Sequence, residues 1–393
     1  MDMETAGGCP VHCTEATMEL TQYQIDYCME CGVCTASCPI SYERPSFSPR
    51  QMIKRAMLEP EGDLLAGDDI WACLSCSRCS DRCPVGIDFP EFIRTLRMKA
   101  RKQGNLPRKS HHGVFQTLTE IQSRMPLSTR QQRTTWAEGA GTFRQKGDLL
   151  YFVGCLPYYD IVFQYLEMNA IESARSLLKL FNRMGVEPVI SNDEKCCGHD
   201  AWWTGREETF QKLAEANMAM IEAAGAKTVV FGCPEGYITF RDCYPQVVGE
   251  LPFEIIHVSE YLARELPGSG VTFSCDEKAA VTYQDPCRLG RRAGIYDAPR
   301  ELIRMVQGAD LAEMPNHREN AICCGTSAWM ECSSCSKVQQ TNRLAEAQGT
   351  GAAALVTACD KCKIHFTCAR SSTDMKLGVV DLYTWLAGCM VDE

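Results

Sequence analysis

Short apolar runs alternate with longer amphipathic stretches through the second half of the chain. The apolar runs have the length of strands and cover residues 149–153, 228–231, 279–283 and 354–357. The helix-like stretches between them include residues 207–224 and 337–348. Strands that alternate with helices form mainly parallel sheets. The pattern therefore predicts two similar α/β units, residues 148–268 and 269–393, that form an internal repeat.

Cysteines recur at matching places in the two units. Each unit has a double cysteine followed by glycine, in Cys196-Cys197-Gly198-His199-Asp200-Ala201-Trp202 and Cys323-Cys324-Gly325-Thr326-Ser327-Ala328-Trp329. Further cysteines lie where strands should end, at Cys155, Cys233, Cys287 and Cys359. Ligands of open α/β sheets bind outside the carboxyl ends of the strands. We therefore expect the cysteines of each unit to converge, with the units facing each other about a pseudo-twofold relationship.

The second unit has one thiol more than the first. It contains Cys359-Asp360-Lys361-Cys362, where the first unit has Cys233-Pro234-Glu235-Gly236. Adjacent cysteines cannot easily serve one ion as a tetrahedral pair, but they can share the irons of a larger cluster, so a cluster is favoured over zinc. The five candidate ligands and catalytic residues are Cys287, Cys323, Cys324, Cys359 and Cys362. The first unit offers Cys155, Cys196, Cys197 and Cys233, for a simpler cluster, a zinc ion or a purely structural site.

Residues 23–103 contain two copies of a different cysteine motif. The copies are Cys28-x-x-Cys31-x-x-Cys34-x-x-x-Cys38-Pro39 and Cys73-x-x-Cys76-x-x-Cys79-x-x-x-Cys83-Pro84. Three thiolates at every third position wrap one [4Fe–4S] cubane, and the fourth, before proline, reaches a second cubane. The predicted ligand sets are crossed: Cys28, Cys31, Cys34 and Cys83 for one, and Cys73, Cys76, Cys79 and Cys38 for the other. Zinc ribbons, the alternative, use cysteine pairs at longer separations.

The remaining segments carry weaker signals. Apolar spacing and an early proline predict helices over residues 49–58 and from 89 to about 102, which would shield the clusters from water. Residues 104–147 are predicted to be a linker or docking segment, with basic residues that more often form a solvated face than a binding site. Residues 1–22 are predicted to be an exposed tail, although Cys9 and Cys13 could add ligands. The predicted class is α+β: a small helical domain followed by two α/β modules.

Composition and charge narrow the class of protein. The chain has 393 residues, enough for two or three domains, and its net charge of −10 argues against nucleic-acid binding. Its 25 cysteines include several Cys-x-x-Cys groups, and no secretion signal is evident, which indicates metal ligation in a reducing compartment such as the cytoplasm. No apolar run approaches the roughly 20 residues needed to span a bilayer. Any membrane association is therefore expected to come through a partner.

Several side chains beside the cysteines are candidates for substrate binding or proton transfer. The three arginines after Cys287 either hold an anionic substrate tail or are surface charges; they are Arg288, Arg291 and Arg292. His199 and Asp200 either donate a proton or orient neighbouring groups through hydrogen bonds. The second role is favoured because Thr326 and Ser327 occupy the same places in the other unit.

Other cysteines and the tryptophans lie outside the repeated motifs. Cys332 and Cys335 have redox-active spacing at an expected helix start. Together with Cys243 and Cys368, however, they are more typical of buried cysteines that pack near a cluster. The tryptophans predicted to lie in the core or to shield a cluster are Trp202, Trp203 and Trp329.

From about Cys28 to Cys368 the sequence resembles the catalytic subunit of heterodisulfide reductase, which joins a double ferredoxin motif to two cysteine-rich CCG domains. The resemblance implies a noncubane [4Fe–4S] cluster at the five-cysteine motif of the second unit, and a place in anaerobic metabolism. Similar proteins include iron–sulfur subunits of glycolate and lactate oxidation, sulfite-reduction membrane and class II benzoyl-CoA reductase complexes, and a thiol-driven fumarate reductase. Because Gly236 replaces a ligand, relatives with one noncubane cluster fit better.

Two functions are compatible with these motifs. The first is an oxidoreductase subunit that passes electrons through two cubanes to a noncubane cluster for thiol/disulfide chemistry. The second is a non-catalytic electron-transfer subunit that links a flavoprotein or low-potential reductase to quinone or ferredoxin. Expected partners are other redox subunits, such as a flavoprotein, ferredoxin, hydrogenase or membrane cytochrome/quinone subunit. The chain has no glycine-rich dinucleotide fingerprint, so flavin would belong to a partner.

Overall fold

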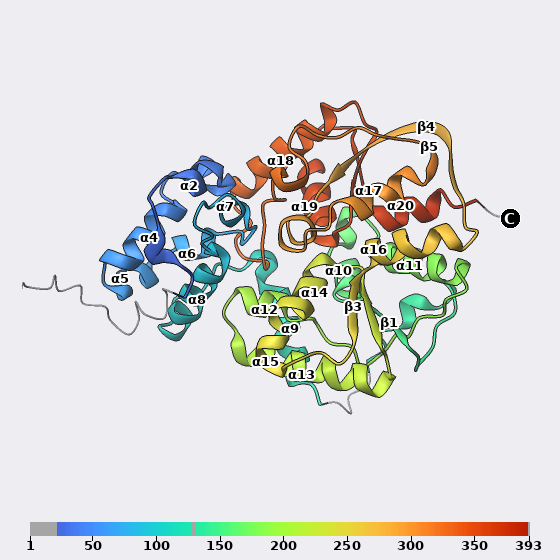
Figure 1. Ribbon diagram of the computed structural model, residues 1–393, viewed down its shortest axis with the longest axis horizontal. Helices are drawn as coiled ribbons and strands as arrows, with labels where there is room; N and C mark the ends of the chain where they lie inside the picture. The colour runs from blue at the N-terminus through green and yellow to red at the C-terminus, as the bar shows by residue number, and fades with distance from the viewer. Residues whose placement is uncertain (1–21, 127–130, 392–393) are drawn as a thin grey trace, which may run out of the picture.

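The computed structural model describes residues 22–126 and 131–391, with only the backbone described for residues 276–279. The predicted tail with Cys9 and Cys13 lies outside the described residues. Figure 1 shows a helical region in blue at one end and two sheet-containing regions beside it, the first green to yellow and the second orange to red. The predicted α+β class, with helices first and two parallel sheets after them, is confirmed.

The first region is helical and holds the double ferredoxin motif. Its elements are η1 (Ile25–Tyr27), α2 (Val33–Ser37), α3 (Pro39–Glu43), α4 (Pro49–Leu58), α5 (Glu61–Ala66), α6 (Asp69–Ala72), α7 (Arg78–Asp81) and α8 (Phe89–Lys102). Both predicted helices, α4 and α8, are confirmed. Each begins at a side-chain cap, because Ser48 accepts a hydrogen bond from the Gln51 amide and Asp88 from the Glu91 amide, at 3.3 Å in both cases.

The segment predicted to be a linker or docking segment, residues 104–147, contains an 11-residue helix, α9 (Val114–Arg124), between η2 (Ser110–Gly113) and η3 (Thr135–Ala137). The apolar pattern missed α9 because much of its buried face is polar and includes Gln116 and Gln122. These amides bind backbone groups of other segments, so the helix docks on both cysteine-rich modules.

The basic residues of this segment are not all solvated, contrary to the prediction. Arg133 is buried and pairs with the buried Glu194 at 2.7 Å. Glu194 also accepts hydrogen bonds from the backbone amides of Val153 and Gly154, at 2.9 and 2.8 Å. The ion pair therefore fastens the segment to the end of the first strand of the first module.

The first cysteine-rich module has a three-stranded parallel sheet. Its strands are β1 (Leu149–Phe152), β2 (Thr228–Phe231) and β3 (Glu254–His257), in spatial order β1-β2-β3. Its helices are α10 (Leu156–Val162), η4 (Gln164–Leu166), α11 (Glu172–Arg183), α12 (His199–Trp203), α13 (Glu207–Ala224), α14 (Pro234–Ile238), η5 (Thr239–Cys243), α15 (Pro245–Val248), α16 (Val258–Glu265) and η6 (Leu266–Gly268). The predicted helix over 207–224 and strand over 228–231 have the predicted ends.

The second module repeats this order and adds an edge strand. Its strands are β4 (Phe273–Gln284), β5 (Val306–Leu311), β6 (Ala354–Thr357) and β7 (Gly378–Asp381), in order β5-β4-β6-β7. Its helices are η7 (Arg288–Arg292), α17 (Asp297–Arg304), η8 (Arg318–Asn320), α18 (Ser334–Gln348), α19 (Asp360–Arg370) and α20 (Leu382–Gly388). Strands β4, β6 and β7 correspond to β1, β2 and β3. All pairings are parallel, so the expected internal repeat is present in the fold.

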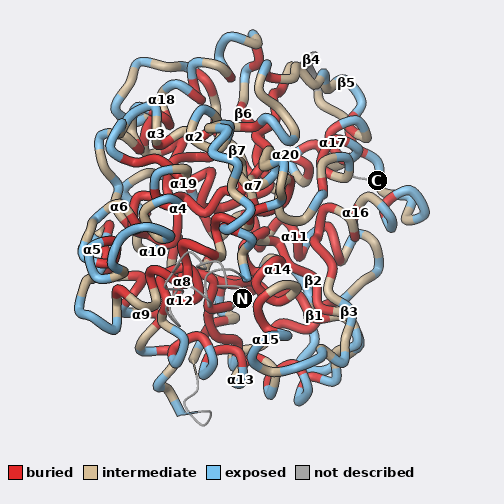
Figure 2. The backbone as a smooth tube through the Cα atoms, turned by 60° about the vertical axis from the view of Figure 1, so that its left-hand side comes forward, coloured by how far each residue is buried: buried red, intermediate tan, exposed pale blue. Residues whose placement is uncertain are grey.

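The modules pack on each other through helices from both. Helix α11 packs against α20, and α16 packs against α17. Figure 2 shows buried positions filling the interior where the helical region and the two modules meet. Trp203 and Trp329 are among the largest fully buried side chains, and Trp202 is also buried, so the prediction that these tryptophans lie in the core is confirmed. In the described part of the chain, no helix has the length and apolar character needed to cross a bilayer.

His257 provides a test of the buried sheet end. It is fully buried at the carboxyl end of β3, its Nδ1 atom lies 2.7 Å from Ser259 Oγ, and burial lowers its pKa from 6.5 to about 3. The folded state keeps the ring neutral, so its contribution to stability is complete above pH 6.5 and is lost as pH falls from 6.5 toward 3. Lowering the pH from 7 to 5 should reduce the free energy of unfolding of the wild type by about 2 kcal/mol more than it reduces that of His257→Gln. Urea unfolding at the two pH values measures this difference. Equal pH dependence in the two proteins would contradict this.

Candidate metal centres

The ferredoxin-type cysteines line two neighbouring cavities. The first has a volume of about 430 Å³, including its opening to solvent, and is lined by Cys28, Cys31, Cys34 and Cys83, with Cys79 also at its wall. The second has a volume of about 330 Å³, again including its opening to solvent, and is lined by Cys38, Cys73, Cys76 and Cys79. Tight loops bring the thiols inward, with positive φ angles at Gly32, Ser75 and Ser77. The structure thus groups the cysteines in the sets that crossed pairing requires; the ligation of iron stays a prediction.

The five cysteines of the second module form a continuous group of neighbouring thiols. Hydrogen bonds between thiols link Cys287 to Cys323 and Cys323 to Cys324. Two more link Cys324 to Cys362 and Cys362 to Cys359. All except the half-buried Cys287 are buried. Hydrogen bonds from the Cys323 and Cys362 thiols lower the pKa of Cys324 to about 6. A thiolate is the form that binds metals, so the arrangement favours ligation.

The first module brings its cysteines together in a smaller group. Cys155 Sγ lies 3.9 Å from Cys196 Sγ, and hydrogen bonds from Cys155 and Cys197 hold the pKa of Cys196 well below its usual value. Burial raises the pKa of Cys233, which lies across from Cys359 of the second module. At Gly236 a Cβ atom would lie 3.3 Å from a ring carbon of Phe231, so the ring closes this side of the site.

The arginines after Cys287 are neither free anion-binding groups nor surface charges. Arg288 is buried and donates a hydrogen bond to the Ser75 carbonyl oxygen, and its guanidinium lies 4.7 Å from the Trp203 ring centroid. Arg291 donates to the Cys76 carbonyl oxygen at 2.8 Å. Arg292 pairs with Asp88 and Glu91 at 3.4 and 3.5 Å. These contacts hold the second ferredoxin loop against Cys287, which places the second cavity beside the five-thiol group.

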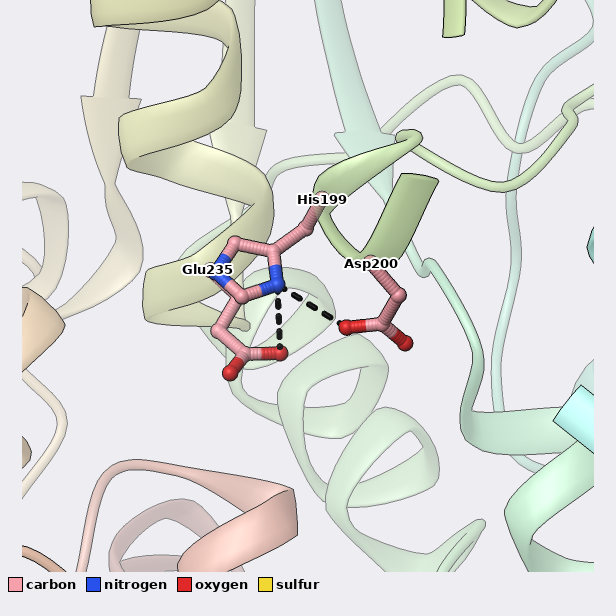
Figure 3. Close-up of side chains that lie close together, drawn as sticks. All are labelled: His199, Asp200 and Glu235. Atoms are coloured by element: carbon pink, nitrogen blue, oxygen red, sulfur yellow. Dashed lines mark hydrogen bonds and ion pairs between the residues drawn. The ribbon is translucent and has the colours of Figure 1, made fainter. Parts of the chain in front are cut away.

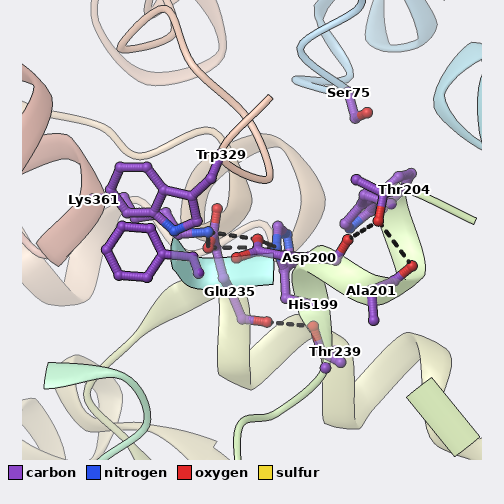
Figure 4. Close-up of polar contacts among 12 residues, drawn as sticks. Ser75, His199, Asp200, Ala201, Thr204, Glu235, Thr239, Trp329 and Lys361 are labelled. Carbon is purple, nitrogen blue, oxygen red and sulfur yellow. Dashed lines mark hydrogen bonds and ion pairs between the residues drawn. The ribbon is translucent and has the colours of Figure 1, made fainter. Parts of the chain in front are cut away.

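A buried network of charged side chains joins the two modules. Lys361 Nζ lies 2.6 Å from both Asp200 Oδ1 and Glu235 Oε2. His199 Nδ1 lies 3.0 Å from Asp200 Oδ1 and 3.4 Å from Glu235 Oε2, as Figure 3 shows. Figure 4 shows the ammonium group of Lys361 between the two carboxylates, beside Trp329. All four charged or polar side chains are buried.

This network occupies equivalent places in the repeat. Glu235 and Lys361 are the third residues of the matching motifs that begin at Cys233 and Cys359, and the two side chains meet directly. Histidine and two carboxylates could hold a cation, but the Lys361 ammonium already takes that place. Although burial acts to lower it, the two carboxylates hold the pKa of Lys361 well above its usual value. The favoured hydrogen-bonding role for His199 and Asp200 agrees with this geometry.

Several side chains near the thiols had no clear signal in the sequence. His365 Nδ1 lies 3.3 Å from Cys324 Sγ, and the only hint was its position one turn after Cys362 on α19. Cys275 Sγ and Cys389 Sγ lie 2.8 Å apart although 114 residues separate them. The ion pairs of Lys361 also required the folded structure, because their partners lie more than 100 residues away.

The extra cysteines differ in their placement. Cys243 is buried, as predicted, but Cys332 is exposed, and Cys335 and Cys368 are half-buried. The expected helix start is confirmed, because α18 begins at Ser334. Although Cys332 is exposed overall, partial desolvation of its sulfur raises the pKa of the thiol, which disfavours the thiolate.

Removing Lys361 tests the buried network. Lys361→Met leaves two buried carboxylates without their cation, and we expect it to lower the free energy of unfolding by about 3–5 kcal/mol. Lys227→Met is the matched control, because Lys227 is 77 % exposed in its ion pair with Asp148 and should contribute under about 1 kcal/mol. Urea unfolding followed by tryptophan fluorescence measures both. Similar losses of unfolding free energy in the two variants would mean that the buried network stabilises the protein no more than an exposed ion pair does.

Comparison with known protein families identifies the two kinds of domain. The 4Fe-4S dicluster domain family matches residues 24–87, and the cysteine-rich domain family matches residues 149–241 and 281–367. The chain therefore belongs to the iron–sulfur proteins that combine a dicluster ferredoxin domain with CCG domains.

Individual relatives narrow this class further. The chain is 28 % identical, over 402 residues, to a subunit of the dihydromethanophenazine:CoB–CoM heterodisulfide reductase of Methanosarcina mazei, covering 94 % of this chain and 96 % of the relative. It is 30 % identical over 209 residues to the EtfAB:quinone oxidoreductase of Syntrophomonas wolfei, covering 50 % of this chain and 29 % of the relative. A hypothetical protein from Helicobacter pylori shares the fold, with a TM-score of 0.55 at 12 % identity over 97 % of this chain and 74 % of that one. The chain is thus an iron–sulfur oxidoreductase protein homologous to the Methanosarcina heterodisulfide reductase subunit.

Proposed function

We propose that the chain passes electrons through two [4Fe–4S] cubanes to a noncubane [4Fe–4S] cluster at which a disulfide is reduced to two thiols, or two thiols are oxidised in reverse. The reduction consumes two electrons and two protons and breaks one S–S bond. The ligands of the cubanes are the crossed sets Cys28, Cys31, Cys34, Cys83 and Cys73, Cys76, Cys79, Cys38. The noncubane ligands are Cys287, Cys323, Cys324, Cys359 and Cys362.

One observation carries this proposal. Five thiols converge in the second module directly beside the cavity lined by Cys73 and Cys76, held there by Arg288 and Arg291. The donor set fits an iron–sulfur cluster, since the described cysteines contain no disulfide and thiolates are its usual ligands. When bound, such a cluster supplies single electrons and an iron site for a substrate sulfur. The chain's own residues bury the thiols and exclude water, with His365 beside Cys324 and Trp329 packed against His365.

The similarity to EtfAB:quinone oxidoreductase supports a second candidate. In that case the chain carries electrons between a flavoprotein or low-potential reductase and quinone or ferredoxin, without a substrate of its own. Other redox subunits are the expected partners in both cases, and the proposed location is the cytoplasm, at a membrane only through such a partner. The response of the protein to thiols separates the two candidates.

A thiol-induced paramagnetic signal tests the catalytic proposal. We expect anaerobically purified, oxidised protein to give a new electron paramagnetic resonance signal with a thiol substrate, because a substrate sulfur binds at the five-cysteine site. Cys323→Ala and Cys362→Ala should lower this signal at least tenfold by removing ligands. Cys243→Ala, a buried cysteine outside the ligand sets, should keep it. If no thiol changes the spectrum of the wild type, the electron-transfer candidate is favoured.

Iron content tests the difference between the modules. With three clusters the wild type should hold about 12 iron atoms per chain, four for each cluster. Gly236→Cys restores the fifth thiol of the first module, at a helical position where only a small movement of Phe231 is needed, and should raise the content to about 16.

The control for this substitution is Gly268→Cys, where a Cβ atom meets no neighbouring group. It adds a thiol without completing a motif and should leave iron at the wild-type value. Iron and acid-labile sulfide are measured together, with zinc to identify a zinc ion in the first module. Unchanged iron in Gly236→Cys would mean that the missing thiol does not decide the occupancy of that module.

A further inference from the structure

A cavity lies between the helical domain and the second cysteine-rich module, apart from the two thiol-lined cavities of the ferredoxin region. It has a volume of about 770 Å³, including its opening to solvent. One wall contains Cys73 and Leu74 of the second ferredoxin loop, and the other contains Ser327 and the first turn of α18. The cavity therefore touches both a proposed cubane ligand and the loop that follows the double cysteine at 323–324.

The first turn of α18 presents hydrogen-bond donors to this cavity. Ser333, Ser334 and Ser336 lie in the lining, and the N-cap residue Ser333 makes no side-chain capping bond. The first amides of a helix have no partner within the helix, and the helix dipole favours negative charge there. An uncapped start of a 15-residue helix thus faces the cavity.

The lining contains two arginines and one carboxylate, and each arginine also has an aspartate partner. Arg44 is paired with Asp69 at 2.9 Å and lies 3.8 Å from Glu331, which also lines the cavity. Arg108 also lines the cavity; its side chain is 78 % exposed, and its ion pair with Asp68 is long, at 3.8 Å.

Ser327 is an independent indication of a ligand. The residue is only 5 % exposed, and within the described structure its Oγ atom has no hydrogen-bond partner. Buried hydroxyl groups are almost always hydrogen-bonded. Its counterpart in the first module, Asp200, is bound by Lys361, whereas Ser327 is a residue of the cavity lining and its buried hydroxyl has no partner among the described residues.

We propose that this cavity binds the anionic end of a small molecule, a carboxylate, sulfonate or phosphate, through the start of α18, Ser327 and Arg108. The identification of that molecule as the thiol or disulfide substrate rests on the proposed function. Because Arg288 and Arg291 bind backbone carbonyls of the ferredoxin loop, they do not serve as the anion site that the sequence suggested. The cavity supplies an anion-binding site next to the second cysteine-rich module instead.

Direct binding to the full anaerobic protein tests the anion site. Isothermal titration calorimetry with methanesulfonate, inorganic phosphate and acetate, and with neutral dimethyl sulfone as the comparison, identifies the preferred group. We expect the preferred anion to bind and dimethyl sulfone not to bind. Ser333→Asp should lower the affinity for the anion at least tenfold, because a carboxylate at the N-cap occupies the start of the helix while it stabilises the helix. Arg108→Gln and Ser327→Ala should each lower the affinity for the anion several-fold.

Two surface variants serve as matched controls. Arg144→Gln removes an arginine that is 62 % exposed and paired with Glu187, and Ser371→Ala removes an exposed serine hydroxyl. Both should bind the anions as the wild type does. Absence of anion binding, or equal binding to wild type and Ser333→Asp, overturns the proposed site.

Thiols of different charge separate this inference from the proposed function. The paramagnetic signal should require at least tenfold less 3-mercaptopropionate than 2-mercaptoethanol, and Ser333→Asp should remove that preference. If anions bind but no thiol changes the paramagnetic signal, the anion site is supported and the proposed thiol chemistry is contradicted. If both thiols induce the signal at the same concentrations, the thiol chemistry is supported, and the proposal that the cavity binds the thiol substrate is contradicted.

Discussion

The contact of Lys361 with Asp200 and Glu235 is the constraint on which the arrangement of the two modules depends. Three charges lie where solvent does not reach, and each carboxylate would be costly to bury without the ammonium group between them. Because Lys361 lies between Cys359 and Cys362, and Glu235 follows Cys233 closely, the ion pairs also fix the thiol groups of the two modules relative to each other. The position of the proposed catalytic site therefore follows from charge balance across the repeat.

Arginine plays a corresponding part between the helical domain and the modules. Arg97 is fully buried and donates to the carbonyl oxygens of Ile70, Cys73 and Trp203. Arg288 makes the same kind of contact from the other side, to Ser75. A guanidinium has several donors in a fixed plane, so one side chain can satisfy carbonyls from segments that meet at an interface. These positive charges also lie beside thiols that would be anionic when they bind metal.

The segment between the domains has a role that its composition conceals. Gln122 accepts a hydrogen bond from the Cys196 amide at 2.8 Å, and Gln116 and Ser110 donate to the Trp329 carbonyl at 3.1 and 2.8 Å. A single stretch of chain thus holds the first double cysteine itself and the loop that follows the second. Polar side chains make these contacts because loop backbone groups in a buried region need partners.

Local patterns explain which features the sequence determined by itself. The spacing of the cysteine motifs, helices α4, α8 and α13, strands β2 and β6, and the internal repeat all depend on neighbouring residues, so short windows of sequence were enough. The tertiary structure alone decided that Lys361 pairs with Asp200 and Glu235, that Arg288 binds a ferredoxin loop, and that Ser327 belongs to the lining of a cavity. The physical reason is that each of these contacts joins segments far apart in the chain. Which buried charge or hydroxyl finds a partner is settled only when the domains pack together.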